Sequence, residues 1–465
     1  MLTAVCRKHN LIRSLRAVLL GLIAAAVVVT GCGPAPAASP TPAATISPSP
    51  NPSETRALPS STATSSVPGT VTIWVEWNQA ELRTLERLIS EYRDLHPGAR
   101  FEIVYHQSGE LRPAFEAALE DGPVPSLLIG PSDWGDPLHE AGALRDLTGS
   151  VLDEQRETIH PLAWSQVDRG EVILGLPLEL KGTLLYRNSS WALEPPATVA
   201  DMVEAGQAAR RAGAVGAALD LSFPQSAPMI RTCRDRFTLE TGTDPVSRPA
   251  GLCWLRMLDR IGDAGEVVFS SDEDLQAFRE GRAAWLLESS GQLAELRDDI
   301  GADRLAVDGW PRYEPTGERL AGYTWTENMY FPRAASDQDF EAAFAFAVFL
   351  LAAENQRTLA QASGVNHIPG LRDVTLKDPL LSAAREILVV GVERPDMRAY
   401  TRLAAELNTA ARLVVTQGGD PELALELALE EIRLALAPTA TPTPTVSPTL
   451  SPTPSQTPFP TPPPG

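Results

Sequence analysis

The sequence VTIWVEWNQAELRTLERLISEYRDLHPGARFEIVYH at residues 71–106 contains two strand patterns separated by a helical one. Its first five residues form an uninterrupted apolar run, which is typical of a strand buried on both faces. From residue 79 to 95 the apolar residues recur at helical spacing, and Pro97-Gly98 ends that pattern. Residues 101–105 are strand-like again. The stretch therefore predicts a strand, a helix and a second strand.

The same alternation continues along the chain. Residues 111–119 have helical spacing, and residues 126–129 form a third apolar run. This order implies a parallel sheet with right-handed crossovers, and such sheets bind ligands beyond the carboxyl ends of their strands. The loops after Val75 and Ile129 are therefore the first places to expect a site. Further helices are expected at residues 339–363, 380–390, 398–416 and 421–436.

The N-terminus has the pattern of an export signal. Residues 1–31 carry four basic residues and no acidic one, and residues 17–29 are apolar but short for a permanent transmembrane helix. The run ends in Val-Thr-Gly-Cys at 29–32, which resembles the lipobox of bacterial lipoproteins. The resemblance implies cleavage after residue 31, lipidation of Cys32, and an extracytoplasmic protein anchored to the cell membrane. The alternative is a short membrane anchor with an incidental cysteine.

Proline-rich segments flank the body of the chain. Residues 32–68 and 438–465 consist mainly of Pro, Ala, Ser and Thr, and they contain too few large apolar residues to form a core. We expect the first to be a spacer and the second a disordered tail, with a folded body at about 69–437. The formal net charge of −20 excludes a general affinity for nucleic acid.

Two of the four cysteines remain once Cys6 leaves with the signal and Cys32 is lipidated. These are Cys233 and Cys253, an even pair in an oxidising compartment, which favours a disulfide. Two free thiols are the alternative.

Six motifs in order resemble family 1 extracellular solute-binding proteins of ATP-binding-cassette (ABC) importers, the maltose-binding-protein-like group. Residues 71–106 match the opening of that family. The later matches are PSLLIGPSDWGDPLHEAGALRDL (125–147), GLPLELKGTLLYRN (175–188) followed by PPATVADMVEAGQAA (195–209), FREGRAAWLLESSGQL (278–293), GWPRYEPTGERLAGYTWTENMYFP (309–332) and ENQRTLAQASGVNHIPGLRD (354–373).

The resemblance implies an α/β, two-lobed fold of the type II periplasmic-binding-protein kind, with a ligand cleft between the lobes. Lobe 1 would comprise residues 69–178 with 322–368, and lobe 2 residues 179–321 with 369–437. Hinge motion would close the lobes around a ligand, and an ABC permease would recognise the closed form.

A sugar site needs carboxylates and amides for the hydroxyl groups and aromatic faces for the C–H surface. The loop after the first strand offers Trp77, Asn78 and Gln79, although Trp77 would serve equally well as a core residue. After the third strand come Asp133, an acidic position in sugar-binding relatives, and Trp134. Asp133 has a helix cap or turn residue as its alternative role.

The crossings between lobes supply further candidates. Glu179 and Lys181 lie at the first crossing, where a hinge salt bridge is the alternative to ligand binding. The remaining candidates are Phe223, Ser289 and Ser290 in lobe 2, and Tyr323, Trp325 and Glu327 at the third crossing. Several relatives close an aromatic residue over the ligand near position 401, where this chain has only Tyr400.

These features predict a binding protein without enzymatic activity, metal or cofactor. It would act as a monomer that captures a small neutral solute, a sugar or oligosaccharide, for import. One alternative is a ligand sensor or surface-interaction protein that keeps the fold. The other is a glycoside hydrolase that uses Asp133, Glu179 or Glu327, although nothing in the sequence pairs these carboxylates. Motifs for phosphate binding or a nucleophilic serine are absent from the sequence.

Overall fold

The structure, a computed structural model, describes residues 69–238, 244–269, 271–395 and 397–436. The expected signal segment (1–31), spacer (32–68) and tail (438–465) lie outside the described residues. Within the described part of the chain, no helix is long and apolar enough to cross a membrane.

The chain begins with the predicted alternation of parallel strands and helices. Strands β1 and β2 are parallel, and β1 is also parallel to β3, so β1 lies between the other two. The side chain of Asn78 accepts hydrogen bonds from the first amides of α1 and so fixes the start of that helix. The elements are β1 (Thr70–Val75), α1 (Gln79–Leu95), β2 (Arg100–Tyr105), α2 (Leu111–Asp121) and β3 (Leu127–Pro131).

Two strands connect the two halves of the sheet. The first half of β4 (Leu176–Asn188) pairs with β9 (Tyr323–Tyr330), and its second half pairs with β7 (Ala283–Ser289) and β8 (Leu305–Asp308). The sheet order is β2-β1-β3-β9-β4-β7-β5-β6, with β5 (Gly216–Asp220) and β6 (Gly265–Val268) at the far side. The short strand β10 (Val392–Glu393) pairs with the start of β9.

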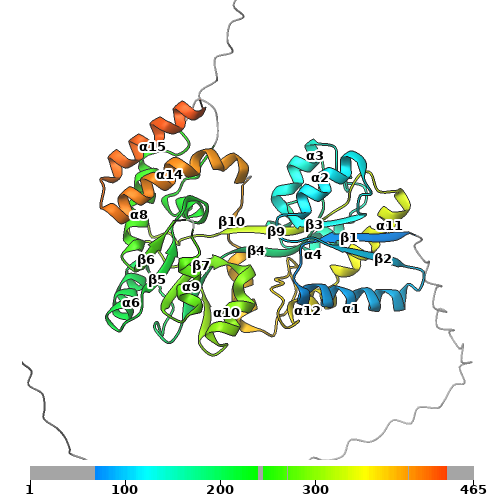
Figure 1. Cartoon of the computed structure of the whole chain (residues 1–465), viewed down its shortest axis with the longest axis horizontal. Helices are drawn as coiled ribbons and strands as arrows, with labels where there is room; N and C mark the ends of the chain where they lie inside the picture. The colour runs from blue at the N-terminus through cyan, green and yellow to red at the C-terminus, as the bar shows by residue number, and fades with distance from the viewer. Residues whose placement is uncertain (1–68, 239–243, 270, 396, 437–465) are drawn as a thin grey trace, which may run out of the picture. The chain divides into compact units, whose positions relative to one another are not determined.

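Helices cover both halves of the sheet (Figure 1). Helix α11 packs on β1, α6 on β5, α9 on β7 and α13 on β4, while α14 and α15 pack on α8. The longer helices are α6 (Val199–Arg211), α8 (Arg248–Gly262), α10 (Leu293–Ile300), α11 (Asp337–Leu350), α12 (Ala353–Ala360), α13 (Pro379–Leu388), α14 (Met397–Gln417) and α15 (Pro421–Leu436). The shorter ones are α3 (Gly135–Glu140), α4 (Asp153–Thr158), α5 (Pro161–Ser165), α7 (Phe223–Ser226), α9 (Glu273–Arg279) and the 3₁₀ turns η1 (Ser132–Trp134), η2 (Ala227–Cys233) and η3 (Ser290–Gln292).

One expected helix is interrupted. The prediction of a continuous helix over 339–363 is wrong, because α11 ends at Leu350 and α12 begins at Ala353. Two side-chain amides of α12 donate to the last carbonyl groups of α11: Asn355 Nδ2 to Phe349 O at 2.6 Å, and Gln356 Nε2 to Leu350 O at 3.0 Å. The Asn355 bond adds to the backbone bond that Phe349 O accepts from the Ala352 amide at 3.1 Å, and the Gln356 bond gives Leu350 O a partner at the helix end.

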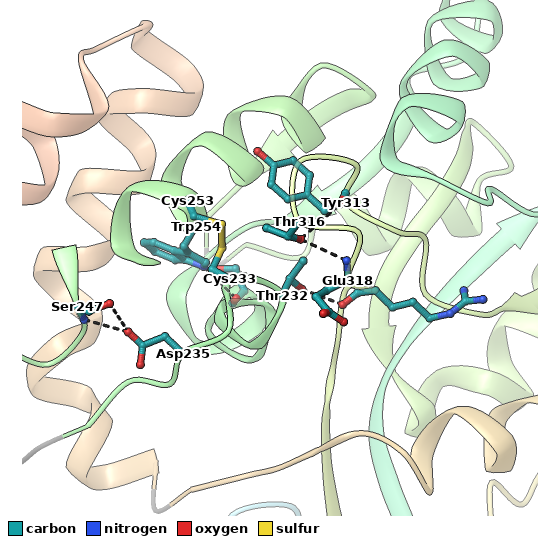
Figure 2. The surroundings of a disulfide bond; sticks show 11 residues. Thr232, Cys233, Asp235, Ser247, Cys253, Trp254, Tyr313, Thr316 and Glu318 are labelled. Carbon is teal, nitrogen blue, oxygen red and sulfur yellow. Dashed lines mark hydrogen bonds between the residues drawn. A yellow bond between two sulfur atoms is a disulfide. The ribbon is translucent and has the colours of Figure 1, made fainter. Parts of the chain in front are cut away.

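Cys233, at the end of η2, and Cys253, in α8, are joined by a disulfide in the structure (Figure 2). Their Cα atoms are 5.9 Å apart and their positions in the sequence differ by 20. The adjacent Trp254 is fully buried and donates from its indole nitrogen to Ser226 O at 3.1 Å. The bond therefore holds η2 against the buried face of α8.

The disulfide gives a first prediction. Replacing both Cys233 and Cys253 with serine is expected to lower the free energy of unfolding by about 3 kcal/mol, because the open chain has more conformations when unfolded. Chemical denaturation with and without reductant measures this change, and the double variant serves as the control that reductant should not affect. Alkylation of both thiols in the native, unreduced protein would contradict the pairing.

Candidate functional site

Strand β9 brings several of the predicted residues to one place. It runs antiparallel between β3 and β4, so that Glu327 lies opposite Pro131 on one side and Glu179 on the other. Trp325 lies opposite Lys181 in the same ladder. Directly opposed residues of antiparallel strands project from the same face of the sheet. Glu179, Lys181, Trp325 and Glu327 therefore share one face where the two halves of the sheet join.

Lys181 is the centre of an ion cluster on that face. Its Nζ is 3.1 Å from Glu179 Oε1 and 3.1 Å from Glu327 Oε2. The side chains of Glu179 and Glu327 are only 2% and 14% exposed, so neither carboxylate can rely on water. Breaking a buried pair by removing one partner commonly costs about 3–5 kcal/mol. The cluster is therefore a structural element as well as a set of polar groups.

Two further segments reach the cluster. His367 Nδ1 lies 3.2 Å from Glu179 Oε2, and its Nε2 is 3.0 Å from Gln356 Oε1 in α12. Glu81 in α1 is close enough to be influenced by Lys181, Glu179 and His367, although burial is the main cause that raises its pKa. The crossing strands are thereby coupled to α1 and α12.

The two buried glutamates differ in protonation. Burial raises the pKa of Glu327 to about 8, with Glu179 adding to the effect and Lys181 opposing it. Burial also opposes ionisation of Glu179, but Lys181 and His367 outweigh it and hold the pKa of Glu179 below its ordinary value. These directions predict that the proton of the pair is held by Glu327 and not by Glu179.

Trp325 also belongs to a second group of side chains, which is centred on Arg394. The guanidinium carbon of Arg394, just after β10, lies 4.3 Å from the centre of the Trp325 ring. Arg394 Nη2 is also 3.2 Å from Asp133 Oδ1 in η1. Asp133 and Trp325, two predicted ligand residues, therefore hold the same guanidinium between them.

Two cavities lie beside Arg394 and share Glu393. The first, of about 110 Å³, is lined by polar residues that include Ser132, Asp133, Asp136, Arg169 and Arg394. The second, of about 280 Å³, is lined by Ile230, Phe237, Tyr323, Pro395 and Tyr400 among others, and so has a more apolar wall. One cavity offers hydrogen-bonding groups and the other offers aromatic surface, which are the two requirements of a sugar site.

Three predicted aromatic residues pack into the protein. Trp77 is 4% exposed, and its indole nitrogen has no hydrogen-bond partner among the described residues. Phe223 is fully buried and stacks on Tyr400 at 5.9 Å between ring centres. The Trp134 ring covers Gly130, where an added Cβ would come within 2.5 Å of the ring. The guanidinium of Arg112 in α2 lies over the face of the same ring. In this arrangement these rings serve packing.

The remaining predicted residues lie around the same junction. Gln79 is exposed at the start of α1, beside the capping residue Asn78. Ser290 Oγ accepts from the Gly182 amide at 3.2 Å, and Ser289 Oγ accepts from the Gly291 amide at 3.1 Å. Ser290 therefore attaches the turn after β7 to β4, and Ser289 stabilises the turn itself. Tyr323 is 5% exposed and forms part of the wall of the second cavity.

Arg394, His367 and Glu81 take part in these contacts but were not predicted from the sequence. Arg394 belongs to the sequence VERPD (392–396), whose charges and proline are typical of a surface turn. Its partners Asp133 and Trp325 lie far away along the chain, so no local spacing identifies them. Within the described part of the chain, no group of three or more His, Cys, Asp or Glu residues is placed to hold a metal ion.

The sequence matches a known protein family. Residues 87–386 match the family model described as bacterial extracellular solute-binding protein. The maltotriose-binding protein of Pyrococcus abyssi (strain GE5 / Orsay) is 28% identical over 136 residues, which are 29% of this chain and 30% of that protein. The match thus spans less than a third of the curated relative's length. The chain belongs to the bacterial extracellular solute-binding protein family.

Solved structures agree with the predicted fold class. The GacH receptor of Streptomyces glaucescens GLA.O, described unliganded and with acarbose, is 19% identical, covers 79% of this chain and 97% of its own, and has a TM-score of 0.63. The cyclic α-maltosyl-1,6-maltose binding protein of Arthrobacter globiformis is 17% identical, with 79% and 99% covered and a TM-score of 0.66. MalE of Bdellovibrio bacteriovorus, bound to maltotriose, is 19% identical, with 79% and 99% covered and a TM-score of 0.60. The two-lobed α/β fold is confirmed.

The proton on Glu327 gives a second prediction. An unfolded glutamate loses its proton near its ordinary pKa of 4.5, whereas the folded protein keeps it up to about pH 8. The folded state therefore binds more protons across this range, and its stability falls as the pH rises through it. Glu327→Gln cannot ionise and should lack this part of the pH dependence.

Melting temperatures of both proteins between pH 5 and pH 8 measure the effect. The titrating groups outside this cluster are common to both proteins, so the difference between the two curves reports the interacting pair of Glu327 and Glu179. The wild-type protein should lose stability relative to Glu327→Gln as the pH rises. Parallel curves would show that Glu327 does not hold the proton.

Proposed function

We propose that this chain is the extracytoplasmic substrate-binding lipoprotein of an ABC importer, and that it captures a neutral sugar or oligosaccharide. The observation that carries the proposal is that Asp133 and Trp325 approach a single planar group from two sides. A carboxylate beside an indole face suits a sugar ring, which presents hydroxyl groups at its edge and C–H bonds on its faces. The names of the relatives, which refer to maltose, maltotriose and related sugars, support the same ligand class.

The ligand site that we propose includes the side chains predicted at the strand crossings. Asp133 would accept hydrogen bonds from hydroxyl groups, Trp325 would stack on a ring, and Lys181 with Glu327 would form the polar floor. Gln79 and Asn78 would contribute amides from the start of α1. Trp77, Trp134 and Phe223 would support the site through packing.

Closure of two lobes around the ligand is the second part of the proposal. Lobe 1 would be residues 69–178 with 322–368, and lobe 2 residues 179–321 with 369–437. The change of partner along β4, from β9 to β7 at Gly182–Thr183, supports a hinge close to this boundary. A monomer closed on its ligand would then present a surface to the permease.

A binding role is preferred to catalysis. Glu179 and Glu327, the carboxylates that a glycoside hydrolase would need, both point at Lys181 and are engaged by it at 3.1 Å. Both carboxyl groups therefore contact the Lys181 ammonium group, and the relatives are binding proteins. A sensor that retains the fold is the second candidate.

Ligand binding provides the third prediction. Maltotriose and a panel of neutral oligosaccharides should raise the melting temperature, since a ligand that binds only the folded state stabilises it. Trp325→Ala should weaken the affinity about tenfold through loss of stacking, with little change in the melting temperature of the free protein. Trp164→Phe, a change at a buried tryptophan that lines another cavity, is the control. Absence of any shift across the panel would reject the sugar, and release of reducing ends would favour the hydrolase.

Lipidation of Cys32 provides the fourth prediction. Cys32→Ala in the full chain should move the protein from the membrane fraction to the soluble extracytoplasmic fraction, because a diacylglyceryl group supplies the anchor. Fractionation followed by immunodetection measures this, and Cys6→Ala is the matched control that should stay in the membrane. A Cys32→Ala protein that remains membrane-bound would contradict the lipid anchor.

A further inference from the structure

Arg394 is held by contacts to β9 and to η1. Its backbone amide donates to Thr324 O at 3.0 Å, which continues the short pairing of β10 with β9. Its guanidinium then lies over the Trp325 ring and beside Asp133. The side chain is 19% exposed, so it covers the ring while one edge stays in contact with solvent.

The guanidinium uses the two groups that a bound sugar would use. It is planar, so it stacks on an indole, and its N–H groups donate to a carboxylate. A pyranose ring makes the same two kinds of contact, with its C–H face on the indole and its hydroxyl groups on the carboxylate. Arg394 and a sugar therefore cannot occupy this face of Trp325 at the same time.

We propose that Arg394 is a built-in competitor that occupies the sugar position on Trp325 and Asp133, and that it must leave before a ligand binds there. The inference rests on the proposed function, because it assigns the sugar to these two residues. In this proposal, Arg394 sets the minimum binding strength that a ligand needs to enter the site. Only ligands whose contacts outweigh those of the guanidinium gain access to the site.

The structure offers a place for the displaced side chain. The cavity of about 110 Å³ next to Arg394 is lined by the acidic residues Asp136, Glu140 and Glu393. Asp136 already pairs with Arg169, and Glu393 accepts from Ser165 at 3.4 Å. A guanidinium that swings away from Trp325 would thus remain close to negative charge.

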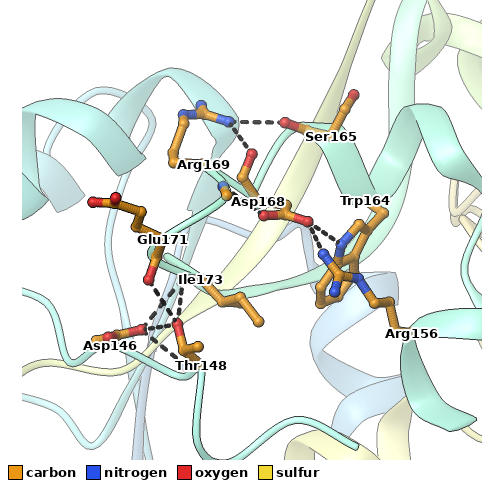
Figure 3. A network of polar contacts seen from close by, with 10 residues as sticks. Asp146, Thr148, Arg156, Trp164, Ser165, Asp168, Arg169, Glu171 and Ile173 are labelled. Atoms are coloured by element: carbon orange, nitrogen blue, oxygen red, sulfur yellow. Dashed lines mark hydrogen bonds and ion pairs between the residues drawn. The ribbon is translucent and has the colours of Figure 1, made fainter. Parts of the chain in front are cut away.

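The chain contains a matched control for this geometry. Arg156 lies over the Trp164 ring, at 5.1 Å from its centre, and forms an ion pair with Asp168 (Figure 3). Trp164 Nε1 also donates to Asp168 at 2.8 Å, so the three residues form a closed set. This arginine, tryptophan and aspartate have the same chemistry as Arg394, Trp325 and Asp133, but they include none of the proposed ligand residues.

The test compares Arg394→Ala with Arg156→Ala in the full chain by titration calorimetry with maltotriose. If Arg394 occupies the site nine-tenths of the time, its removal tightens the measured affinity about tenfold. Arg156→Ala should leave the affinity unchanged. If the melting temperature of Arg394→Ala shows that this variant does not fold, Arg394→Met replaces it. Methionine keeps an apolar stem and removes the charge.

Methylguanidinium gives an independent readout. In Arg394→Ala it should restore competition and weaken maltotriose binding towards the wild-type value, with no such effect in Arg156→Ala. An affinity that is unchanged or weaker in a folded Arg394→Ala protein would overturn the inference while leaving the binding function intact. Absence of sugar binding by the wild-type protein and by both variants would overturn the proposed function, and the inference with it.

Discussion

Lys181 lies between Glu179 and Glu327 where β4 and β9 pass from one half of the sheet to the other, and the described site is built around that contact. Removing a partner from such a cluster leaves a charge with little water around it, so Lys181 adds a side-chain connection to the backbone ladder of β4 and β9. Through Glu179 the same contact extends to His367 and then to Gln356 of α12. This pairing therefore connects β4, β9 and α12 next to the proposed ligand site.

The part of the proposed site around Arg394 is held by fewer contacts than the Lys181 cluster. Arg394 follows a strand of only two residues, and its guanidinium rests on an aromatic ring and one carboxylate. Beyond it, Tyr323 and Tyr400 line the apolar cavity, and Tyr400 donates to Phe237 O at 2.7 Å. The site thus combines a floor that is costly to disturb with a wall attached by a few weak contacts. Such a combination suits a protein that must admit and release a solute.

Periodicity predicted the first strands and helices because each is determined by residues close together in the sequence. The parallel order of β1, β2 and β3 also followed from the alternation of strand and helix. The break between α11 and α12 was missed because side-chain amides of Asn355 and Gln356 donate to the end of α11, which apolar spacing does not reveal. At the site, Glu179 and Lys181 were predicted at one crossing between the lobes, and Trp325 and Glu327 at another. The pairing of β4 with β9, which brings the four together, was not predicted because it joins segments that are far apart in the sequence. The orientation of Trp77 and Trp134, and the role of Arg394, depend on contacts between distant segments.

Because β10 is short, the residue that follows it could change in evolution with little effect on the fold. Two backbone bonds, from Val392 and Arg394 to Gly322 and Thr324, attach it to β9. A residue at such an attachment can be exchanged without disturbing the buried layers, because it lies at their margin. Variation at position 394 would then alter how tightly a solute is held while the architecture stays the same. A family of receptors could in this way adapt one scaffold to environments that are rich or poor in nutrient.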